Sequence, residues 1–440
     1  MKANNLAKAK NFILDNLVVI LFAAFTASGF ILAGGVSPIY FLNELIDRVF
    51  RNSFLVLSLI IPVIAGLGLN FGIVIGAMAG QMAIIFVRYH DMGGLGALML
   101  CFLISFPLAL LFGWMTGKLY NKVRGQEMIA SLIVGFFANG IYYFIFLFAV
   151  GYIIPVSPDN PLIKFDGIGV RMSVDLGLHQ DGGMKYALDN IIRIPFMYLV
   201  LAASLGILAW LVIKQFHSRK MGNEQLAMSN DKPPANNRSL NWKFIINCTI
   251  CGALAVFSLI AIITGSELMN LRKAPLVTAL VIIALCLFLQ FLGKTKLGQD
   301  FRSVGQNQHI AEISGINVDR TRIIATIFST VLAAWGMIIY MQNMGTLATY
   351  DSHRNIGLFS VAALLVGGAS TSKASVKNAL VGAALFNSMT IVSPELGQTL
   401  FGDPGSGEYF RSFMVYGVIG LALGLYVWKA LKAERGKNAL

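Results

Sequence analysis

Charged side chains are scarce in this chain of 440 residues, and long stretches of the sequence have none. Asp, Glu, Lys and Arg together make up only 12% of the residues, whereas 56% are hydrophobic. This composition excludes an ordinary soluble domain. Because apolar runs recur along the whole chain, the sequence predicts an all-α, polytopic membrane protein.

Ionisable groups are missing from the middle of the apolar runs. No Asp, Glu, Lys or Arg has to lie there, and all five histidines fall in loops or at the edges of runs. Proton-driven carriers need such groups as relays, since a charge in the membrane is costly unless it is functional. The absence argues against a proton-driven carrier, but it leaves sodium coupling through carbonyl and hydroxyl oxygens open.

Residues for catalysis or metal binding are also lacking. The four cysteines all lie in apolar runs: Cys101, Cys248, Cys251 and Cys286. Cys248 and Cys251 have no second pair, so we interpret them as packing residues. Lys294 and Thr295 resemble the end of a phosphate-binding loop, but Phe288 replaces its first glycine. We therefore expect no catalytic residue, metal or cofactor in this chain, and no ATPase activity of its own.

Twelve apolar runs are candidate membrane spans, since a bilayer core requires about 20 apolar residues per helix. They cover residues 17–36, 53–69, 71–88, 95–117, 128–152, 194–214, 243–263, 275–293, 323–343, 357–369, 376–392 and 411–428. The run 53–88 is too long for one span and is expected to turn between Gly66 and Asn70. Residues 357–369 are too few for a full crossing and predict a half-helix. We expect about 10–12 transmembrane helices, including broken or half helices.

The distribution of charge predicts that both termini are cytoplasmic. With that orientation the cytoplasmic segments hold 23 Lys and Arg against 8 acids, and the outer segments hold 11 against 13. This obeys the positive-inside rule. The basic residues thus reflect orientation, and no basic module for nucleic acid is present. The first run follows Lys2, Lys8 and Lys10 without a cleavage site, so we expect it to remain as a span.

Polar segments divide the chain into two transmembrane halves. The N-terminal half comprises residues 1–214 with a periplasmic loop at 155–193, and the C-terminal half comprises residues 243–440. A cytoplasmic linker, 215–242, joins them, and its Asn, Ser, Lys and Pro content is typical of linkers. Five aspartates give the outer loop a negative charge that suits a docking partner: Asp159, Asp166, Asp175, Asp181 and Asp189.

Two groups of small or amide side chains recur in the N-terminal half. Glycines four residues apart predict a groove for close helix packing: Gly68, Gly72, Gly76 and Gly80. Asn70 and Gln81 bracket that groove, and each amide needs a partner inside a membrane. With Asn139, they are our candidates for a translocation pathway.

The polar segment 294–322 is unusually long for a connection between two spans. Helical spacing places Ile310, Ile313 and Ser314 on one side, and Gln308 and Glu312 on the other. Gly315 ends this short helix as a C-terminal glycine does. We expect a cytoplasmic coupling segment through which another protein moves the membrane domain.

The same segment resembles the permeases of bacterial ATP-binding-cassette (ABC) importers for simple sugars, nucleosides and branched-chain amino acids. The resemblance rests on Thr295, Gly298, Gly305, Asn307, Ala311, Ser314, Gly315 and Ile316. Stretches at 68–70, 79–81, 332–336 and 366–368 agree with it. The resemblance implies that the coupling residues are Gly305, Asn307, Ala311, Glu312, Ile313, Ser314, Gly315 and Ile316. Ile310, Trp335 and Ser372–Ser375 depart from the family pattern.

The resemblance also implies the partners. Two cytoplasmic ATPase subunits would bind ATP and Mg²⁺. A second permease chain, either the same or homologous, would complete the pore. A periplasmic or lipid-anchored protein would deliver the solute. The location implied is the bacterial inner membrane. We expect a permease subunit for a neutral polar solute, a simple sugar or a nucleoside. The alternatives are a branched-chain amino acid permease and a sodium-coupled carrier that acts alone.

Overall fold

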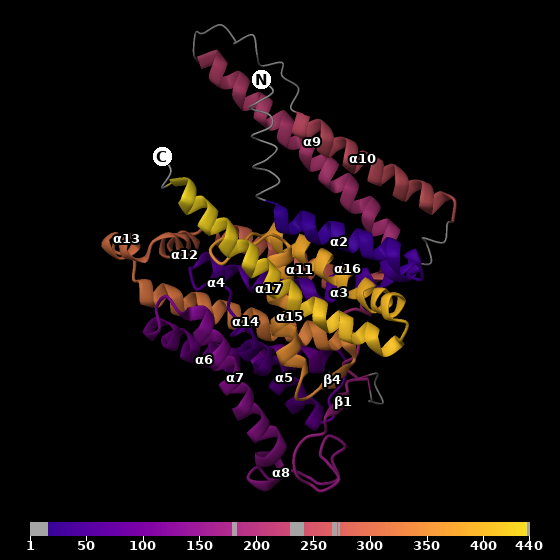
Figure 1. The fold of residues 1–440 in the computed structure, drawn as a ribbon, viewed down its shortest axis with the longest axis vertical. Helices are drawn as coiled ribbons and strands as arrows, with labels where there is room; N and C mark the ends of the chain where they lie inside the picture. Colours follow the sequence, from indigo (N-terminus) through magenta and orange to yellow (C-terminus); the bar gives the residue numbers. More distant parts are fainter. Residues whose placement is uncertain (1–15, 178–182, 229–241, 266–270, 272, 438–440) are drawn as a thin grey trace. The chain divides into compact units, whose positions relative to one another are not determined.

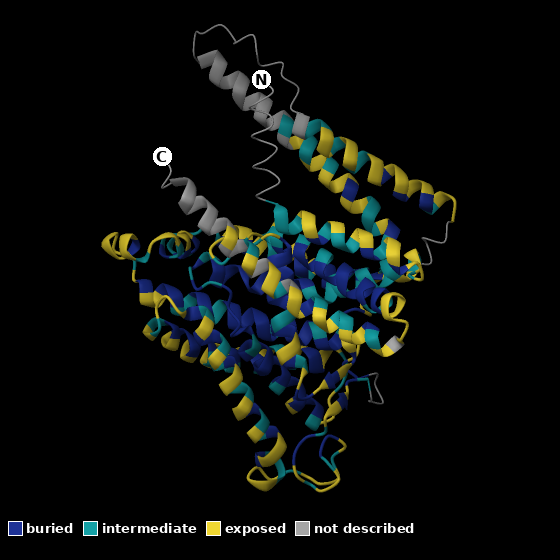
Figure 2. Ribbon diagram, in the orientation of Figure 1, coloured by how far each residue is buried: buried dark blue, intermediate teal, exposed yellow. Residues whose placement is uncertain are grey.

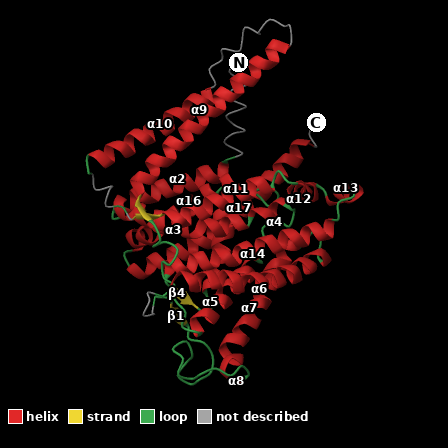
Figure 3. Ribbon diagram, turned by 180° about the vertical axis from the view of Figure 1, so that it is seen from behind, coloured by secondary structure: helices red, strands yellow, loops and turns green. Residues whose placement is uncertain are grey.

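The computed structural model describes residues 16–177, 183–228, 242–265, 271 and 273–437 (Figure 1). The chain forms two compact units: residues 1–191 with 277–440, and residues 192–276. The described residues of unit 1 form helices and two short strands (Figure 3). Its elements are α2 (Leu17–Ala33), α3 (Pro38–Ser58), α4 (Ile60–Ile64), α5 (Ile73–Tyr89), α6 (Gly94–Lys122), α7 (Glu127–Phe144), the π-helical turn η1 (Ile145–Ala149), α8 (Val150–Tyr152), β1 (Ser173–Asp175), α11 (Leu276–Leu292), α12 (Lys296–Gln306), α13 (Gln308–Ile313), α14 (Val318–Met344), β4 (Thr346–Ala348), α15 (Ser352–Val366), α16 (Val376–Phe401) and α17 (Pro404–Lys437).

The helix α14 lies in the interior of unit 1. In its most apolar stretch 67% of the residues are buried, against 28% in α6 and in the span that begins with α7 (Figure 2). It packs against α3, α5 and α6. The interior of the bundle is therefore formed around α14, whereas α6 and α7 present most of their residues outward.

Glycines allow α5 and α6 to approach the α14 backbone closely. A Cβ atom added at Gly76 or Gly80 of α5 would collide with carbonyl oxygens of α14. A Cβ at Gly113 or Gly117 of α6 would lie within 2.9 Å of Cα atoms of α14. Such contacts are typical of small residues between membrane helices. The predicted packing of Gly76 and Gly80 is thus present, and α6 contributes a second pair.

The long apolar run after residue 53 turns where the sequence predicted. Gly66 and Gly68 have φ angles of +75° and +70° between α4 and α5, a conformation that glycine adopts without strain. Gly68 therefore lies in the turn, and its inclusion in the helical groove was wrong. Gly72 is the residue just before α5, where an added Cβ would collide with the Tyr120 hydroxyl.

The helix α3 was not predicted at its full length. The apolar run begins at residue 53, but α3 begins at Pro38 and includes four charged side chains. Arg48 pairs with Glu44 one turn earlier (3.1 Å), and Arg51 donates to Asn343 of α14 (3.3 Å). Because these charges have partners within the bundle, the helix can include them.

The outer loop contains one structural aspartate among the five that were predicted to face a partner. Asp189 is buried, and its carboxylate accepts hydrogen bonds from Thr278 (2.5 Å) and Asn343 (2.8 Å). A docking role for Asp189 is therefore corrected to a packing role. Asp181 lies outside the described residues. The other three are exposed: Asp159, Asp166 and Asp175.

The two strands of unit 1 join the outer loop to the end of α14. The strands β1 and β4 are antiparallel, and Val174 pairs with Leu347. Unit 2 contains β2 (Arg193–Pro195), α9 (Phe196–Met228), α10 (Trp242–Ile263) and β3 (Lys273–Pro275), with β2 antiparallel to β3. The predicted linker begins inside α9, and its residues 229–241 lie outside the described part.

The described residues include six helices long and apolar enough to span a membrane, or seven if α11 and α12, bent by 73°, count as one span. The apolar helices α2 and α5 are shorter, at 17 residues each. The helix α15 has 15 residues, which is short of a full crossing, as its sequence indicated. These elements confirm an all-α, multi-span membrane protein.

Candidate coupling site

The polar segment 294–322 forms two helices joined at Asn307, one more than the sequence predicted. Thr295 starts α12, because its hydroxyl accepts the backbone N–H of Gly298 (3.3 Å). Asn307 starts α13, because its side chain accepts the N–H of Ile310 (3.1 Å). Side-chain caps of this kind stabilise a helix start by about 1 kcal/mol. The two caps thus place the bend at Asn307.

Glycines hold α12 against its neighbours. A Cβ at Gly298 would collide with the Leu292 carbonyl, and a Cβ at Gly305 would collide with the Ile64 carbonyl. A Cβ atom added at Gly66 would lie 2.7 Å from the Gly305 Cα. The turn between α4 and α5 is therefore in backbone contact with the end of α12.

The short helix α13 has one buried side chain and several exposed ones. Ala311 is 2% exposed and packs with Val304 and Val318. In contrast, Ile310 is 61% exposed and Ile313 is 75% exposed. The short helix thus presents two large apolar side chains on its exposed side.

The remaining predicted coupling residues shape the end of α13. Glu312 and Ser314 are exposed, and the Ser314 hydroxyl donates to the Ile310 carbonyl (2.8 Å). Gly315 follows with a φ of +81°, which confirms the predicted helix stop. Ile316 is half-buried beside Ala311 and its neighbours. All eight predicted coupling residues therefore lie in one continuous segment.

A buried arginine of α14 connects α13 with α6 and α7. Arg322, near the start of α14, is 0% exposed. Its guanidinium forms an ion pair with Glu127 at the start of α7 and donates to the Tyr120 carbonyl of α6 (3.2 Å). It also donates to the Gln308 side chain of α13 (3.2 Å). One side chain therefore joins four helices.

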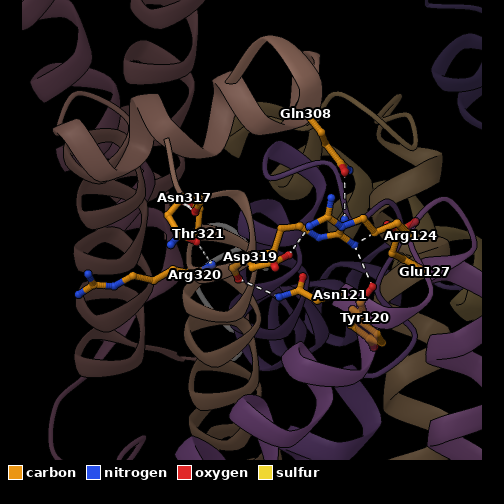
Figure 4. A network of polar contacts seen from close by, with 10 residues as sticks. Tyr120, Asn121, Arg124, Glu127, Gln308, Asn317, Asp319, Arg320 and Thr321 are labelled. Atoms are coloured by element: carbon orange, nitrogen blue, oxygen red, sulfur yellow. Dashed lines mark hydrogen bonds and ion pairs between the residues drawn. The ribbon is translucent and has the colours of Figure 1, made fainter. Parts of the chain in front are cut away.

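A second, exposed ion pair lies beside this arginine. Arg124 and Asp319 pair at 2.5 Å, and Asn121 donates to the Asp319 carbonyl (2.9 Å). Figure 4 shows these side chains between the end of α6 and the start of α14. Exposed pairs contribute only about 0.2–1 kcal/mol each. We therefore attribute the firm attachment of this region to Arg322.

Sequence reasoning missed Arg322 and Glu127, which were counted among the loop charges. Glu127 is the first residue of α7 and Arg322 the fifth of α14, and the later residues of both helices are mostly apolar. An acid and a base at the starts of two such helices are a signal that the ends could pair. The sequence alone does not show which helix ends are neighbours.

The three pathway candidates divide into two places. Asn70 lies in the turn before α5, where its side-chain oxygen accepts from the Tyr120 hydroxyl (2.8 Å). Gln81 and Asn139 instead face the two ring nitrogens of His353, at 2.9 Å and 2.6 Å. The sequence placed His353 at the edge of an apolar run. In the structure its side chain is buried, with 0% exposed. The structure thus brings two of the three candidates together.

Among the described residues, no group of three or more His, Cys, Asp or Glu side chains could hold a metal ion. What the segment 294–322 offers is an apolar contact surface and rigid links to α6, α7 and α14.

Comparison with known proteins identifies the family. The profile of the family described as "Branched-chain amino acid transport system / permease component" matches residues 52–423, which is most of the chain. The chain belongs to this family. It is thus a multi-pass membrane protein of the bacterial inner membrane, as its sequence predicted.

Three curated relatives are similar over part of their length. The nucleoside ABC transporter permease protein NupC of Lactococcus lactis is 30% identical over 177 residues, 39% of this chain and 52% of NupC. The xylose transport system permease protein XylH of Haemophilus influenzae is 31% identical over 156 residues, 35% of this chain and 38% of XylH. NupB of L. lactis, also a nucleoside permease, is 30% identical over 110 residues, 24% of this chain and 28% of NupB. The chain thus spans about half the length of NupC and less of the others. No solved structure matches it.

Proposed function

We propose that this chain is the membrane-spanning subunit of an ABC importer, driven by ATP that a separate cytoplasmic subunit hydrolyses. The observation that carries the proposal is α13, which presents Ile310 and Ile313 outward while Ala311 and Gln308 hold it against the bundle. A helix with exposed apolar side chains and rigid attachments suits contact with a moving partner.

Force applied to α13 has a direct route into the membrane. Gln308 and Glu127 both bind the Arg322 guanidinium, so α13 is linked to α7 as well as to α14. Most residues in the α7 span are not buried, and its end is a π-helical turn, a feature found at functional sites. We infer that α7 is the helix that moves most when the ATPase acts on α13.

The solute is a neutral polar molecule, a nucleoside or a simple sugar. Two relatives are nucleoside permeases and one is a xylose permease, which supports this choice. Branched-chain amino acids are the second candidate, because the description of the matching family names them. The exposed Asp159, Asp166 and Asp175 suit docking of a solute-binding protein, and a second permease chain would complete the pore.

ATP-driven uptake in proteoliposomes tests the proposal against a carrier that works alone. The chain is reconstituted with and without a candidate ATPase and binding protein from the same organism, and each preparation is given ATP inside or a sodium gradient. We expect uptake only with the ATPase and ATP. Uptake by the chain alone, driven by sodium, would establish the carrier instead.

A further inference from the structure

A cavity of about 240 Å³ lies between α5, α7, α15 and α17 of unit 1. Its walls include the aromatic rings of Phe71, Phe136 and Tyr416, and its polar lining includes Asn139 and Arg354. None of its lining residues is acidic. The cavity is thus an aromatic pocket with polar groups on one side.

The hydrogen bonds of His353 determine which end of the Asn139 amide faces this cavity. Gln81 donates its Nε2 to the Thr349 carbonyl (2.6 Å), so its oxygen must face the His353 Nδ1 (2.9 Å) and accept a hydrogen from it. The ring is buried, and within the described residues its hydrogen-bond and ring contacts are Gln81, Asn139 and Tyr142, none of them a carboxylate. A buried ring without a counter-charge is stable in its neutral form.

A neutral His353 with hydrogen on Nδ1 can only accept at Nε2. The Asn139 Oδ1 lies 2.6 Å from that Nε2, which would place two acceptors against each other, so we assign the amide in the reverse orientation, with its NH₂ group donating to Nε2. The two ends of an amide have the same shape and exchange by a half-turn. With its NH₂ turned to His353, the carbonyl oxygen of Asn139 is the end that faces the cavity, where it is an acceptor.

Arg354 supplies the complementary donors. Its side chain is exposed at the cavity, and within the described residues it forms no hydrogen bond or ion pair. A guanidinium presents five N–H donors in one plane. The cavity therefore offers one acceptor, a planar set of donors and aromatic faces.

We propose that this cavity binds the solute during transport and that its chemistry fits a nucleobase. A flat heteroaromatic ring stacks on Phe71, Phe136 or Tyr416, and its edge carries both donors and acceptors for Asn139 and Arg354. A branched-chain amino acid would pair its carboxylate with Arg354, but its ammonium group finds no carboxylate in the lining, and its aliphatic side chain cannot stack on the aromatic rings. A pentose alone has no flat π face. The inference rests on the proposed transport function and assigns its solute as a nucleoside.

Saturation-transfer NMR on the detergent-purified complex of this chain with its ATPase tests the site directly. The probes are uridine, xylose and leucine. We expect signals from the base protons of uridine and none from the other two. Asn139→Leu and Phe136→Leu should each raise the Kd for uridine about tenfold, equivalent to one lost hydrogen bond or stacking contact. Asn355→Ala, on an exposed neighbour that does not line the cavity, is the matched control and should leave the Kd unchanged.

The variants separate a binding role from a structural one. Asn139→Leu also removes the bond to His353, whereas Phe136 is 63% exposed and its replacement should leave the thermal unfolding temperature unchanged. A Kd unchanged in both variants would overturn the site, and binding of xylose or leucine instead would overturn the nucleobase assignment. Either result would leave ATP-driven uptake intact, and only loss of that uptake in the wild-type complex would contradict the proposed function.

Discussion

Arg322 of α14 and Glu127 of α7 form a buried ion pair across 195 residues of sequence. Together with Gln308 they connect the short helix α13, which faces outward, to a helix that lines the aromatic cavity. Asn139 lies twelve residues further along α7 than Glu127, about 18 Å at 1.5 Å per residue. The same helix therefore reaches from the coupling segment to the cavity.

Removing one partner of this ion pair should destabilise the protein strongly. Glu127→Ala leaves the Arg322 guanidinium buried without a carboxylate, which typically costs about 3–5 kcal/mol. We expect a clear fall in the thermal unfolding temperature of the purified chain. Arg320→Ala changes an exposed arginine of the same helix and should have little effect. Equal stability of the two variants would show that the pair contributes nothing.

Enlarging the glycines of α5 should also destabilise the bundle. A Cβ at Gly76 meets the Thr330 carbonyl and the Ala333 side chain, so Gly76→Leu should cost at least about 1–3 kcal/mol through overpacking. Gly72→Leu should act in the same direction. Gly252→Leu is the control, because nothing lies within 4 Å of its added Cβ. Thermal unfolding of the three variants measures the difference, and wild-type stability of Gly76→Leu would rule out the close packing.

The exposed aspartates of the outer loop should speed encounter with a solute-binding protein. Complementary surface charge mainly raises association rates. Neutralising Asp159, Asp166 and Asp175 to Asn should lower the rate and flatten its salt dependence between about 50 and 300 mM, where screening increases. Stopped-flow mixing of the binding protein with the solubilised complex measures both. A rate that is unchanged at every salt concentration would leave the loop as a spacer.

Asp189 should behave differently from those three residues. Its carboxylate is buried and accepts from Thr278 and Asn343, so Asp189→Ala leaves two donors without their acceptor. Unsatisfied buried groups typically cost about 1–3 kcal/mol each. We expect lower thermal stability and no specific change in the salt dependence of association. A stable Asp189→Ala variant with slowed association would instead assign it to the docking surface.

Local features of this fold could be predicted from the sequence, because they depend on neighbouring residues. Asn307 and Gly315 have the residue types that start and stop a helix, and Gly66 and Gly68 mark the turn before α5. Features that depend on distant residues could not. The ion pair of Arg322 and Glu127 joins α14 to α7, and no local sequence pattern shows that these two helices are neighbours. In the same way His353 lies at the edge of an apolar run, yet it is buried because Gln81 and Asn139 surround it.

The length of α3 shows a related limit. A search for apolar runs begins at residue 53 because Arg48 and Arg51 interrupt the pattern. Both arginines bind side chains from distant parts of the chain, Thr390 and Asn343. A prediction from composition alone therefore assigns such charged residues to loops, although in the structure they lie within a helix and are paired with residues of other helices.

The ratio of solute molecules transported to ATP molecules hydrolysed tests the central claim most directly. Ile310→Asp and Ile313→Asp place charge on the exposed face of α13 without touching its buried Ala311, and Lys296→Ala, in α12 and exposed, is the control. In proteoliposomes that contain the complete complex, we expect both aspartate variants to insert and fold normally but to lose most transport per ATP hydrolysed. A wild-type ratio in both variants would contradict the role of α13 as the contact between the permease and its ATPase.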